Sequence, residues 1–289
     1  PLYMVVYNPR TELSRHNRAN QLIEHHWMTK KYQKKLCQIG SFLLAISVIA
    51  GTFVAQAKDN TTLFVAASLA PVIQKLAATF SEKTGRTIRI SAAASSVLAR
   101  QIASGAPADI IVLANPAWMQ WLEDRNLIDN KSRRDLIGNR LALLRHANTS
   151  LPNNMVPALN AALKSGRIAM ADPDHVPAGI YGKAALTALG LWSEVSPALA
   201  RSASAPAAVA LLSRGEVSAA ISYQTDAQLS DKVSVHTVFP QNLYPKIRYQ
   251  IATITNSTNQ TAGLLMKYLG DQERLPVFVA AGFSPPVSP

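Results

Sequence analysis

Residues 64–86 read FVAASLAPVIQKLAATFSEKTGR and set the pattern that decides the fold. A short apolar run ends at Ala67, Ser68 follows, and apolar residues then recur at helical spacing. Gly85 stands where the C-cap of such a helix belongs. The stretch therefore predicts a strand over residues 62–67 that leads, through a single serine, into a helix over residues 69–83.

The same alternation continues on the C-terminal side of this stretch. Strands are predicted over residues 87–92 and 108–114, with helices over 97–104 and 117–125. The order β-α-β-α-β-α is typical of a parallel, doubly wound sheet. The rhythm changes near residue 140, and a second series follows, with predicted helices around residues 155–165, 179–189 and 205–215 and strands at 167–171, 218–223, 233–239 and 246–254. Two further helices are expected around residues 261–281.

This pattern predicts an α/β protein built from two lobes. Residues 58–140 and 239–289 form the first predicted lobe, and residues 141–238 form the second. The chain would cross between the lobes near residue 140 and return near residue 238.

Length and composition allow a full-sized core and argue against nucleic acid as a partner. The chain has 289 residues, of which 48% are hydrophobic, and a formal net charge of +12. Residues 58–289 hold 22 basic and 15 acidic residues, and the basic ones are scattered without interleaved aromatics. Nucleic-acid-binding domains instead concentrate basic residues on one face or stripe.

The N-terminal segment has the pattern of a secretory signal peptide. From Met28, MTKKYQKKLCQ is a basic region, IGSFLLAISVIAGTFV is an uncharged apolar core, and AQA is a small-residue cleavage site. We predict a signal peptide over residues 28–57, cleavage after Ala57 and a periplasmic location. An uncleaved anchor is the alternative, although the apolar core is shorter than the ~20 residues that a spanning helix needs. Residues 1–27 are expected to lie outside the fold.

Cysteine and histidine usage narrows the chemistry. The sole cysteine is Cys37, ahead of the predicted cleavage site, so the mature chain would have neither disulfides nor thiol catalysis. His146, His175 and His236 show no metal-ligand spacing, and the common hydrolase, zinc-peptidase and phosphate-loop motifs are missing from the sequence. His175, in DPDHVPAG, is expected to order a loop. No metal site and no cofactor are predicted.

Three serines mark the junctions between predicted strands and helices. Ser68, Ser95 and Ser96 fall where the carboxyl ends of strands meet helix N-termini, which is where open α/β sheets bind ligands. Helix N-termini favour anions. The structural alternative is that all three serines are plain N-caps, each contributing about 1 kcal/mol.

Four long blocks resemble a known family: AASLAPVIQKLAATFSEKTG, SSVLARQIASGAPADIIVLANPAWMQWLEDRNLI, ADPDHVPAGIYGKAALTALGLW and AVALLSRGEVSAAISYQTDA. They are similar to the periplasmic molybdate-binding proteins of bacterial ABC importers, from about Thr61 to the C-terminus. The resemblance implies a two-lobed type II periplasmic-binding-protein fold with the ligand cleft between the lobes. It also implies a non-enzymatic monomer that takes up molybdate or tungstate and delivers it to a membrane permease.

The resemblance further implies which residues hold the oxyanion: Ser68, Ser95, Ala178, Ala205 and Tyr223. The serines and the tyrosine would donate through hydroxyls, and the two alanines through backbone N–H groups. In the family, the residue matching Ala205 is usually a valine followed by arginine. SASAPAAVALL has neither, so the identity of this fifth donor is the least secure of the set.

A cage that holds only neutral donors would suit a fully deprotonated tetrahedral anion. Hydrogen phosphate would bury its O–H without an acceptor. The remaining alternatives are a carrier of another oxyanion such as sulfate, and a secreted serine hydrolase using Ser68 or Ser95. Tyr223 could also be an ordinary core tyrosine.

Overall fold

The computed structural model describes residues 60–286, within a compact unit that spans Lys58–Pro289. The predicted signal peptide (residues 28–57), its cleavage after Ala57 and the upstream residues 1–27 lie outside the described residues. Within residues 60–286, no helix is both long enough and apolar enough to cross a membrane.

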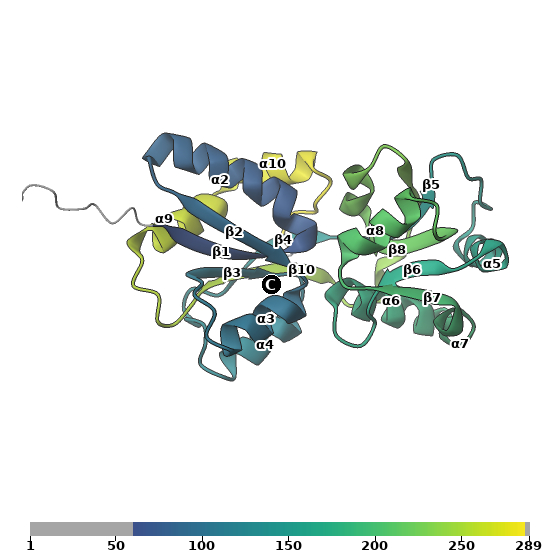
Figure 1. Cartoon of the computed structure of the whole chain (residues 1–289), viewed down its shortest axis with the longest axis horizontal. Helices are drawn as coiled ribbons and strands as arrows, with labels where there is room; N and C mark the ends of the chain where they lie inside the picture. The colour runs from purple at the N-terminus through teal and green to yellow at the C-terminus, as the bar shows by residue number, and fades with distance from the viewer. Residues whose placement is uncertain (1–59, 287–289) are drawn as a thin grey trace, which may run out of the picture. The chain divides into compact units, whose positions relative to one another are not determined.

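The first sheet has five strands in the order β2-β1-β3-β10-β4 (Figure 1). β1, β2 and β3 are mutually parallel, and β10 runs antiparallel to both β3 and β4. The strand bounds are β1 (Thr61–Ala66), β2 (Ile88–Ala93), β3 (Ile110–Leu113), β4 (Arg134–Asn139) and β10 (Ile247–Thr253).

The second sheet repeats this arrangement in the order β7-β6-β8-β5-β9. β6, β7 and β8 are parallel, and β5 runs antiparallel to both β8 and β9. The bounds are β5 (Leu141–His146), β6 (Ile168–Ala171), β7 (Leu199–Ser202), β8 (Ala219–Tyr223) and β9 (Val233–Val238). The bounds of the two lobes themselves stay a prediction.

The prediction of a wholly parallel sheet is wrong for one strand in each sheet. Chain crossing explains the difference. β4 of the first sheet leads through Arg140 into β5 of the second, and β9 of the second sheet leads back into β10 of the first. The strand that enters from the other sheet, β5 or β10, is in each case the antiparallel one.

Helices cover both faces of each sheet (Figure 1). In the first sheet α2 and α9 contribute to one core, and α3 and α4 to another. In the second sheet α8 covers one face, and α5 and α6 contribute to the core on the other. The helix bounds are α2 (Ala70–Thr84), α3 (Ser95–Ala103), α4 (Pro116–Glu123), α5 (Met155–Ser165), α6 (Pro177–Ala188), α7 (Trp192–Val195), α8 (Ala205–Ser213), α9 (Gln260–Leu269) and α10 (Leu275–Ala280), with 3-10 turns η1 (Ala67–Leu69), η2 (Ser196–Ala198), η3 (Gln224–Leu229), η4 (Gln241–Leu243) and η5 (Gln272–Arg274).

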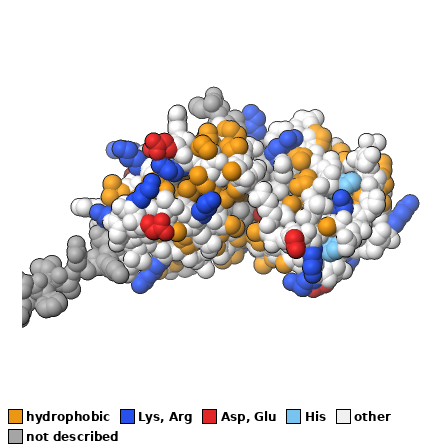
Figure 2. Space-filling view, turned by 90° about the horizontal axis from the view of Figure 1, so that it is seen from above, with side chains coloured by type: hydrophobic (Ala, Val, Ile, Leu, Met, Phe, Trp, Pro, Cys, Tyr) orange, Lys and Arg blue, Asp and Glu red, His pale blue; other side chains and the backbone are white. Residues whose placement is uncertain are grey.

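Burial on both faces explains why the inner strands β1, β3, β6 and β8 are rich in apolar residues. In β1, Leu63 and Val65 pack into one core while Phe64 packs into the other, as the two-residue period of a strand requires. The same split occurs in β5, between Leu143 and Leu144. On the face drawn in Figure 2, Lys and Arg side chains are dispersed among other types, as the sequence predicts.

Candidate functional site

The predicted ligand residues come together in one small pocket at the carboxyl ends of strands from both sheets. β1, β2 and β3 end there, and so do β6, β7 and β8. All five residues, Ser68, Ser95, Ala178, Ala205 and Tyr223, line it. The other lining residues are Ala66, Ala67, Ala94, Ala114, Val176, Pro177, Ser204 and Pro206, so the lining carries no formal charge.

Ser68 is not an N-cap. It lies within the 3-10 turn η1, and no side-chain cap bond is made at the start of η1 or α2. The Ser68 hydroxyl is instead 2.7 Å from the hydroxyl of Tyr249, which lies on β10. The interpretation of this serine as a helix cap is therefore wrong. Its hydroxyl forms a hydrogen bond with a residue distant in sequence and not with the N–H groups of the helix.

Ser95 is not an N-cap either, since it is the first residue of α3 and its hydroxyl makes no cap bond. Ser95 Oγ accepts the backbone N–H of Ala114 at 3.0 Å, so the Ser95 proton stays available as a donor. Ser96 is fully buried, and its hydroxyl has no partner among residues 60–286. It does not line the pocket, and the cap interpretation fails for it as well.

Replacing Ser95 by alanine should lower stability even without ligand. The Ala114 N–H would lose its acceptor at a buried position, which costs about 1–3 kcal/mol. Thermal unfolding of the ligand-free variant measures the loss, with Thr79→Ala as the control. The exposed Thr79 hydroxyl donates only to a carbonyl of its own helix. A Ser95→Ala unfolding temperature equal to that of the unmodified chain would contradict this role.

α6 brings its first turn against the end of β6. Its first residue is Pro177, which has no N–H to leave unpaired, so Ala178 offers the first backbone donor of the turn. Gly179 allows the close approach, because a Cβ there would overlap the carbonyl oxygens of Ala171 and Asp172. The glycine of the HVPAG block thus allows the first turn of α6, which carries the Ala178 N–H, to pack against the end of β6.

α8 leaves one backbone donor in its first three residues. Ser204 caps the helix by accepting the N–H of Ala207 at 3.3 Å, and Pro206 has no N–H. The N–H of Ala205 is the remaining group, at a position where helix geometry supplies no internal acceptor. The departure at Pro206 therefore narrows the choice of donor at this turn to Ala205.

Tyr223 ends β8 with its hydroxyl buried and without a hydrogen-bond partner among the described residues. The residue is 1% exposed. Burial raises the pKa of this hydroxyl well above its usual value, with further contributions from Tyr249, Tyr181 and Asp226. The hydroxyl therefore keeps its proton at any physiological pH and can act as a donor.

Asp226 is a buried carboxylate beside this tyrosine. Its Oδ2 accepts the Ser222 hydroxyl at 2.6 Å and the Tyr223 N–H at 3.1 Å, while Oδ1 has no partner within the described part of the chain. Burial raises the pKa of Asp226 to about 7, although both hydrogen bonds lower it. The group is thus part neutral and part ionised near neutral pH.

This carboxylate should make stability depend on pH. Because the pKa of Asp226 is raised on folding, its stabilising effect is complete below about pH 4 and is lost as pH rises through about 7. Relative to Asp226→Asn, the unfolding free energy should fall by up to roughly 4 kcal/mol over that window. Urea unfolding at a series of pH values measures it. A difference between the two chains that stays constant from pH 4 to 8 would refute it.

The pocket is positive in character although its lining is uncharged. α3, α6 and α8 all begin at lining residues, so their unpaired N–H groups and positive dipole ends converge there. The volume of the pocket is about 20 Å³, which is about the space that one water molecule needs.

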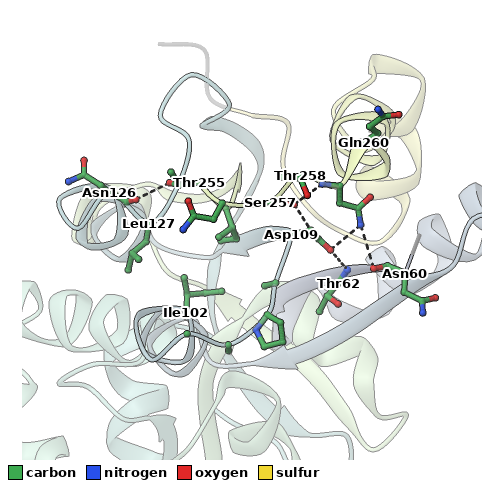
Figure 3. Close-up of a pocket in the computed structure, with 17 residues that line it drawn as sticks. Asn60, Thr62, Ile102, Asp109, Asn126, Leu127, Thr255, Ser257, Thr258 and Gln260 are labelled. Atoms are coloured by element: carbon green, nitrogen blue, oxygen red, sulfur yellow. Dashed lines mark hydrogen bonds between the residues drawn. The ribbon is translucent and has the colours of Figure 1, made fainter. Parts of the chain in front are cut away.

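A larger hollow, of about 950 Å³, lies at the opposite end of the first sheet (Figure 3). Its carboxylate, Asp109, already accepts the Thr62 N–H, the Ser257 hydroxyl and the Asn259 amide. An acidic side chain whose hydrogen bonds are satisfied within the protein does not suit an anion. This hollow contains none of the five predicted ligand residues.

No cluster of three or more His, Cys, Asp or Glu side chains that could hold a metal ion occurs within residues 60–286. His175 Nδ1 lies 3.1 Å from Asp172 Oδ1 within its own loop, and the His175 carbonyl accepts the Trp118 indole N–H at 2.9 Å. These contacts match the predicted loop-ordering role.

Sequence reasoning missed the residues that hold the ligand residues in place. Tyr249 bonds to Ser68, Asn139 bonds to Tyr249, and Ser204 caps the helix that begins at Ala205. None of the three belongs to a recognisable motif. Asp226 lies at the end of the quoted block AVALLSRGEVSAAISYQTDA, three residues after Tyr223. Its position next to a predicted donor was the one available signal.

Comparisons with known proteins agree with this geometry. Residues 61–284 match the family described as bacterial extracellular solute-binding protein. The molybdate-binding protein ModA of Escherichia coli is 36% identical over 239 residues, covering 82% of this chain and 93% of that protein. ModA of Haemophilus influenzae is 36% identical over 256 residues, covering 87% and 99%.

The fold is also that of a solved structure. The periplasmic molybdate-binding protein of Azotobacter vinelandii superposes with a TM-score of 0.70 at 21% identity, covering 80% of this chain and 100% of that one. This likeness confirms the predicted two-lobed α/β fold class. The family model matches residues 61–284, and two relatives are each 36% identical to the chain. The chain therefore belongs to the bacterial extracellular solute-binding protein family.

Proposed function

We propose that this protein is an extracytoplasmic solute-binding protein that captures molybdate, and also tungstate, for delivery to a membrane ABC permease. The anion would bind through the hydroxyls of Ser68, Ser95 and Tyr223 and the backbone N–H groups of Ala178 and Ala205. The observation that carries the proposal is the buried Tyr223 hydroxyl, which has no protein partner among residues 60–286 and belongs to a pocket of converging donors. An oxyanion would supply the missing acceptor.

The donor set favours a fully deprotonated dianion. Each hydrogen bond from a neutral donor to a charged group contributes about 1.5–3 kcal/mol, so several together can hold a dianion without a Lys or Arg. The lining has no carboxylate that could accept an O–H. Hydrogen phosphate would therefore bury its proton unpaired, which is the basis for rejecting it.

Sulfate is also a tetrahedral dianion and is the main competitor for this pocket. The relatives at 36% identity, named for molybdate binding, support molybdate as the ligand. Competition between the two anions for one site would decide between them.

The chain is proposed to act without catalysis and without a cofactor. Among the described residues, Ser95 Oγ is bonded to a backbone N–H and Ser68 Oγ to a tyrosine hydroxyl, and neither contacts a histidine or carboxylate that could serve as a base. A serine nucleophile needs such a base. Covalent labelling of Ser68 or Ser95 by a fluorophosphonate probe would contradict the proposal.

Periplasmic location and a monomeric state complete the proposal. They rest on the signal-peptide pattern over residues 28–57 and on the family to which the chain belongs.

Isothermal titration of the purified protein with molybdate, tungstate, sulfate and hydrogen phosphate tests the function. We expect one site with tight binding of the two metalates, weaker binding of sulfate and no measurable binding of hydrogen phosphate. Equal or tighter sulfate binding would assign the pocket to sulfate transport. No binding of any oxyanion by the folded protein would overturn the proposal.

A further inference from the structure

The Ser68 hydroxyl lies at the end of a short chain of buried hydrogen bonds. Ser68 Oγ is 2.7 Å from Tyr249 Oη, and Tyr249 Oη is 3.3 Å from Asn139 Nδ2. Ser68, Tyr249 and Asn139 are 8%, 0% and 3% exposed. Water is therefore a poor substitute partner for any of the three, and the bonds between them decide where their protons lie.

Asn139 fixes the direction of the chain at its far end. It is the last residue of β4, and its Oδ1 accepts the backbone N–H of Arg140 at 2.8 Å. A backbone N–H can only donate, so the oxygen of the amide is identified and Nδ2 must be the donor. Nδ2 donates to Tyr249 Oη and, at 2.9 Å, to the hydroxyl of Thr225.

Tyr249 then has its own proton left to donate. Its oxygen receives an N–H from Asn139, and burial raises the pKa of its hydroxyl above the usual value, so the proton stays on. The nearest hydroxyl partner is Ser68 Oγ. The pairing register of β10 with β4 shifts between Tyr249 and Gln250, and such irregularities redirect side chains next to functional sites.

We propose that Tyr249, held by Asn139, is a positioning residue that orients the Ser68 hydroxyl toward the bound anion. By donating to a lone pair of Ser68 Oγ, Tyr249 leaves the Ser68 proton free to point into the pocket. This inference rests on the proposed function, since it assumes that Ser68 donates to an oxyanion.

Ser95 has an equivalent arrangement, which supports the direction assigned to Ser68. Ser95 Oγ accepts the N–H of Ala114, and this bond has a single possible direction because the backbone group cannot accept. Both pocket serines thus accept one hydrogen bond from the protein behind them. A serine hydroxyl that accepts a hydrogen bond from the protein has its proton available, so it can donate to a ligand without breaking another hydrogen bond.

The test is a double-mutant cycle on molybdate affinity in the full chain. Tyr249→Phe should weaken binding about threefold to tenfold when Ser68 is present, because the serine proton is no longer directed. In a chain that already carries Ser68→Ala, the same change should have almost no effect on the dissociation constant. Equal losses in both chains would overturn the inference and show that Tyr249 acts only through general packing.

Asn139→Asp is a second route to the same answer. It keeps the acceptor for the Arg140 N–H and the shape of the side chain, but replaces the N–H donor by an acceptor. The Tyr249 hydroxyl would then donate to the carboxylate at position 139 and no longer to Ser68. Ser68 would have to donate its own proton to Tyr249, so that this proton could not point at the anion. Asn139→Asp should therefore weaken molybdate binding more than Tyr249→Phe does. The loss of affinity that Asn139→Asp still causes in a chain carrying Ser68→Ala measures the effect of the added carboxylate charge alone.

Two controls separate the possible failures. Tyr244→Phe removes another buried hydroxyl, which accepts the Leu141 N–H at 3.0 Å and bonds to no pocket residue. It should lower the unfolding temperature and leave the dissociation constant unchanged. If the unmodified chain does not bind molybdate, the proposed function fails. If it binds and the cycle shows no coupling, only the role of Tyr249 fails.

Discussion

Replacing Ala205 by proline is expected to weaken molybdate binding by about a hundredfold or more while α8 stays folded. The N–H of Ala205 is the single backbone donor that the first three residues of this helix leave free, because Pro206 has none and Ser204 caps Ala207. Proline at position 205 removes it. The proline ring carbon that replaces the N–H hydrogen would also occupy space that the anion needs. The loss of binding free energy should therefore lie at the upper end of the range of about 1.5–3 kcal/mol for a hydrogen bond to a charged group.

The backbone at this position tolerates proline, so the effect should be confined to binding. Position 205 is the first residue of the helix, where proline is favoured. Ser204 before it is extended, with φ −159° and ψ 166°, as a residue preceding proline prefers. Circular dichroism and thermal unfolding should therefore be close to those of the unmodified chain.

Ala205→Gly is the matched variant for this measurement. It keeps the N–H and removes only a methyl group, so it should lose far less affinity than Ala205→Pro. Titration calorimetry on the three chains gives the comparison. Binding by the folded proline variant at unmodified strength would mean that another group supplies this donor.

The position of the pocket could be predicted from sequence because it depends on local patterns. Ser68 and Ser95 each follow an apolar run and precede a helical one, and such junctions fall at the carboxyl ends of strands. What their hydroxyls bind could not be predicted in this way. The partner of Ser68 is 181 residues distant and that of Ser95 is 19, so only the folded chain brings them together.

Two of the strands that the sequence analysis missed, β4 and β7, have weak periodic signals. β4 carries arginine, aspartate and asparagine at its ends, and its two large apolar residues, Leu136 and Ile137, are too few to form a recognisable run. β7 has four residues, LARS, with no β-branched side chain. The antiparallel strands could not be foreseen either. Direction in a sheet depends on where the chain re-enters it, and this is a property of the crossings at residue 140 and after residue 238.

At Pro206, where the sequence departs from the family pattern, the structure adds what the sequence lacks. Without the usual valine and arginine, sequence alone could not decide which residue supplies the fifth backbone donor. Helix geometry favours Ala205, because a proline at the second position has no N–H and Ser204 already caps the Ala207 N–H. A backbone donor, as proposed, would leave the side chain at this position free to vary.

Tyr223→Phe should change affinity and stability in opposite directions. The hydroxyl is buried without a partner in the ligand-free protein, so removing it takes away an unpaired polar group and should leave stability unchanged or raise it by about 1 kcal/mol. The bound anion, in contrast, would lose a hydrogen bond worth about 1.5–3 kcal/mol, or roughly tenfold to a hundredfold in dissociation constant.

The opposite signs distinguish a ligand-binding tyrosine from a core tyrosine, which would show no effect on affinity. Tyr181→Phe is the appropriate comparison, because that residue is equally buried and its hydroxyl, 3.4 Å from the Ala114 carbonyl, already has a protein partner. Thermal unfolding with and without molybdate measures both quantities in one experiment, since ligand raises the unfolding temperature according to its affinity. For Tyr223→Phe we expect an equal or higher unfolding temperature without ligand and a clearly smaller increase on adding molybdate. If the increase were the same as in the unmodified chain, the Tyr223 hydroxyl would not touch the anion, and the observation on which the proposed function depends would need another explanation.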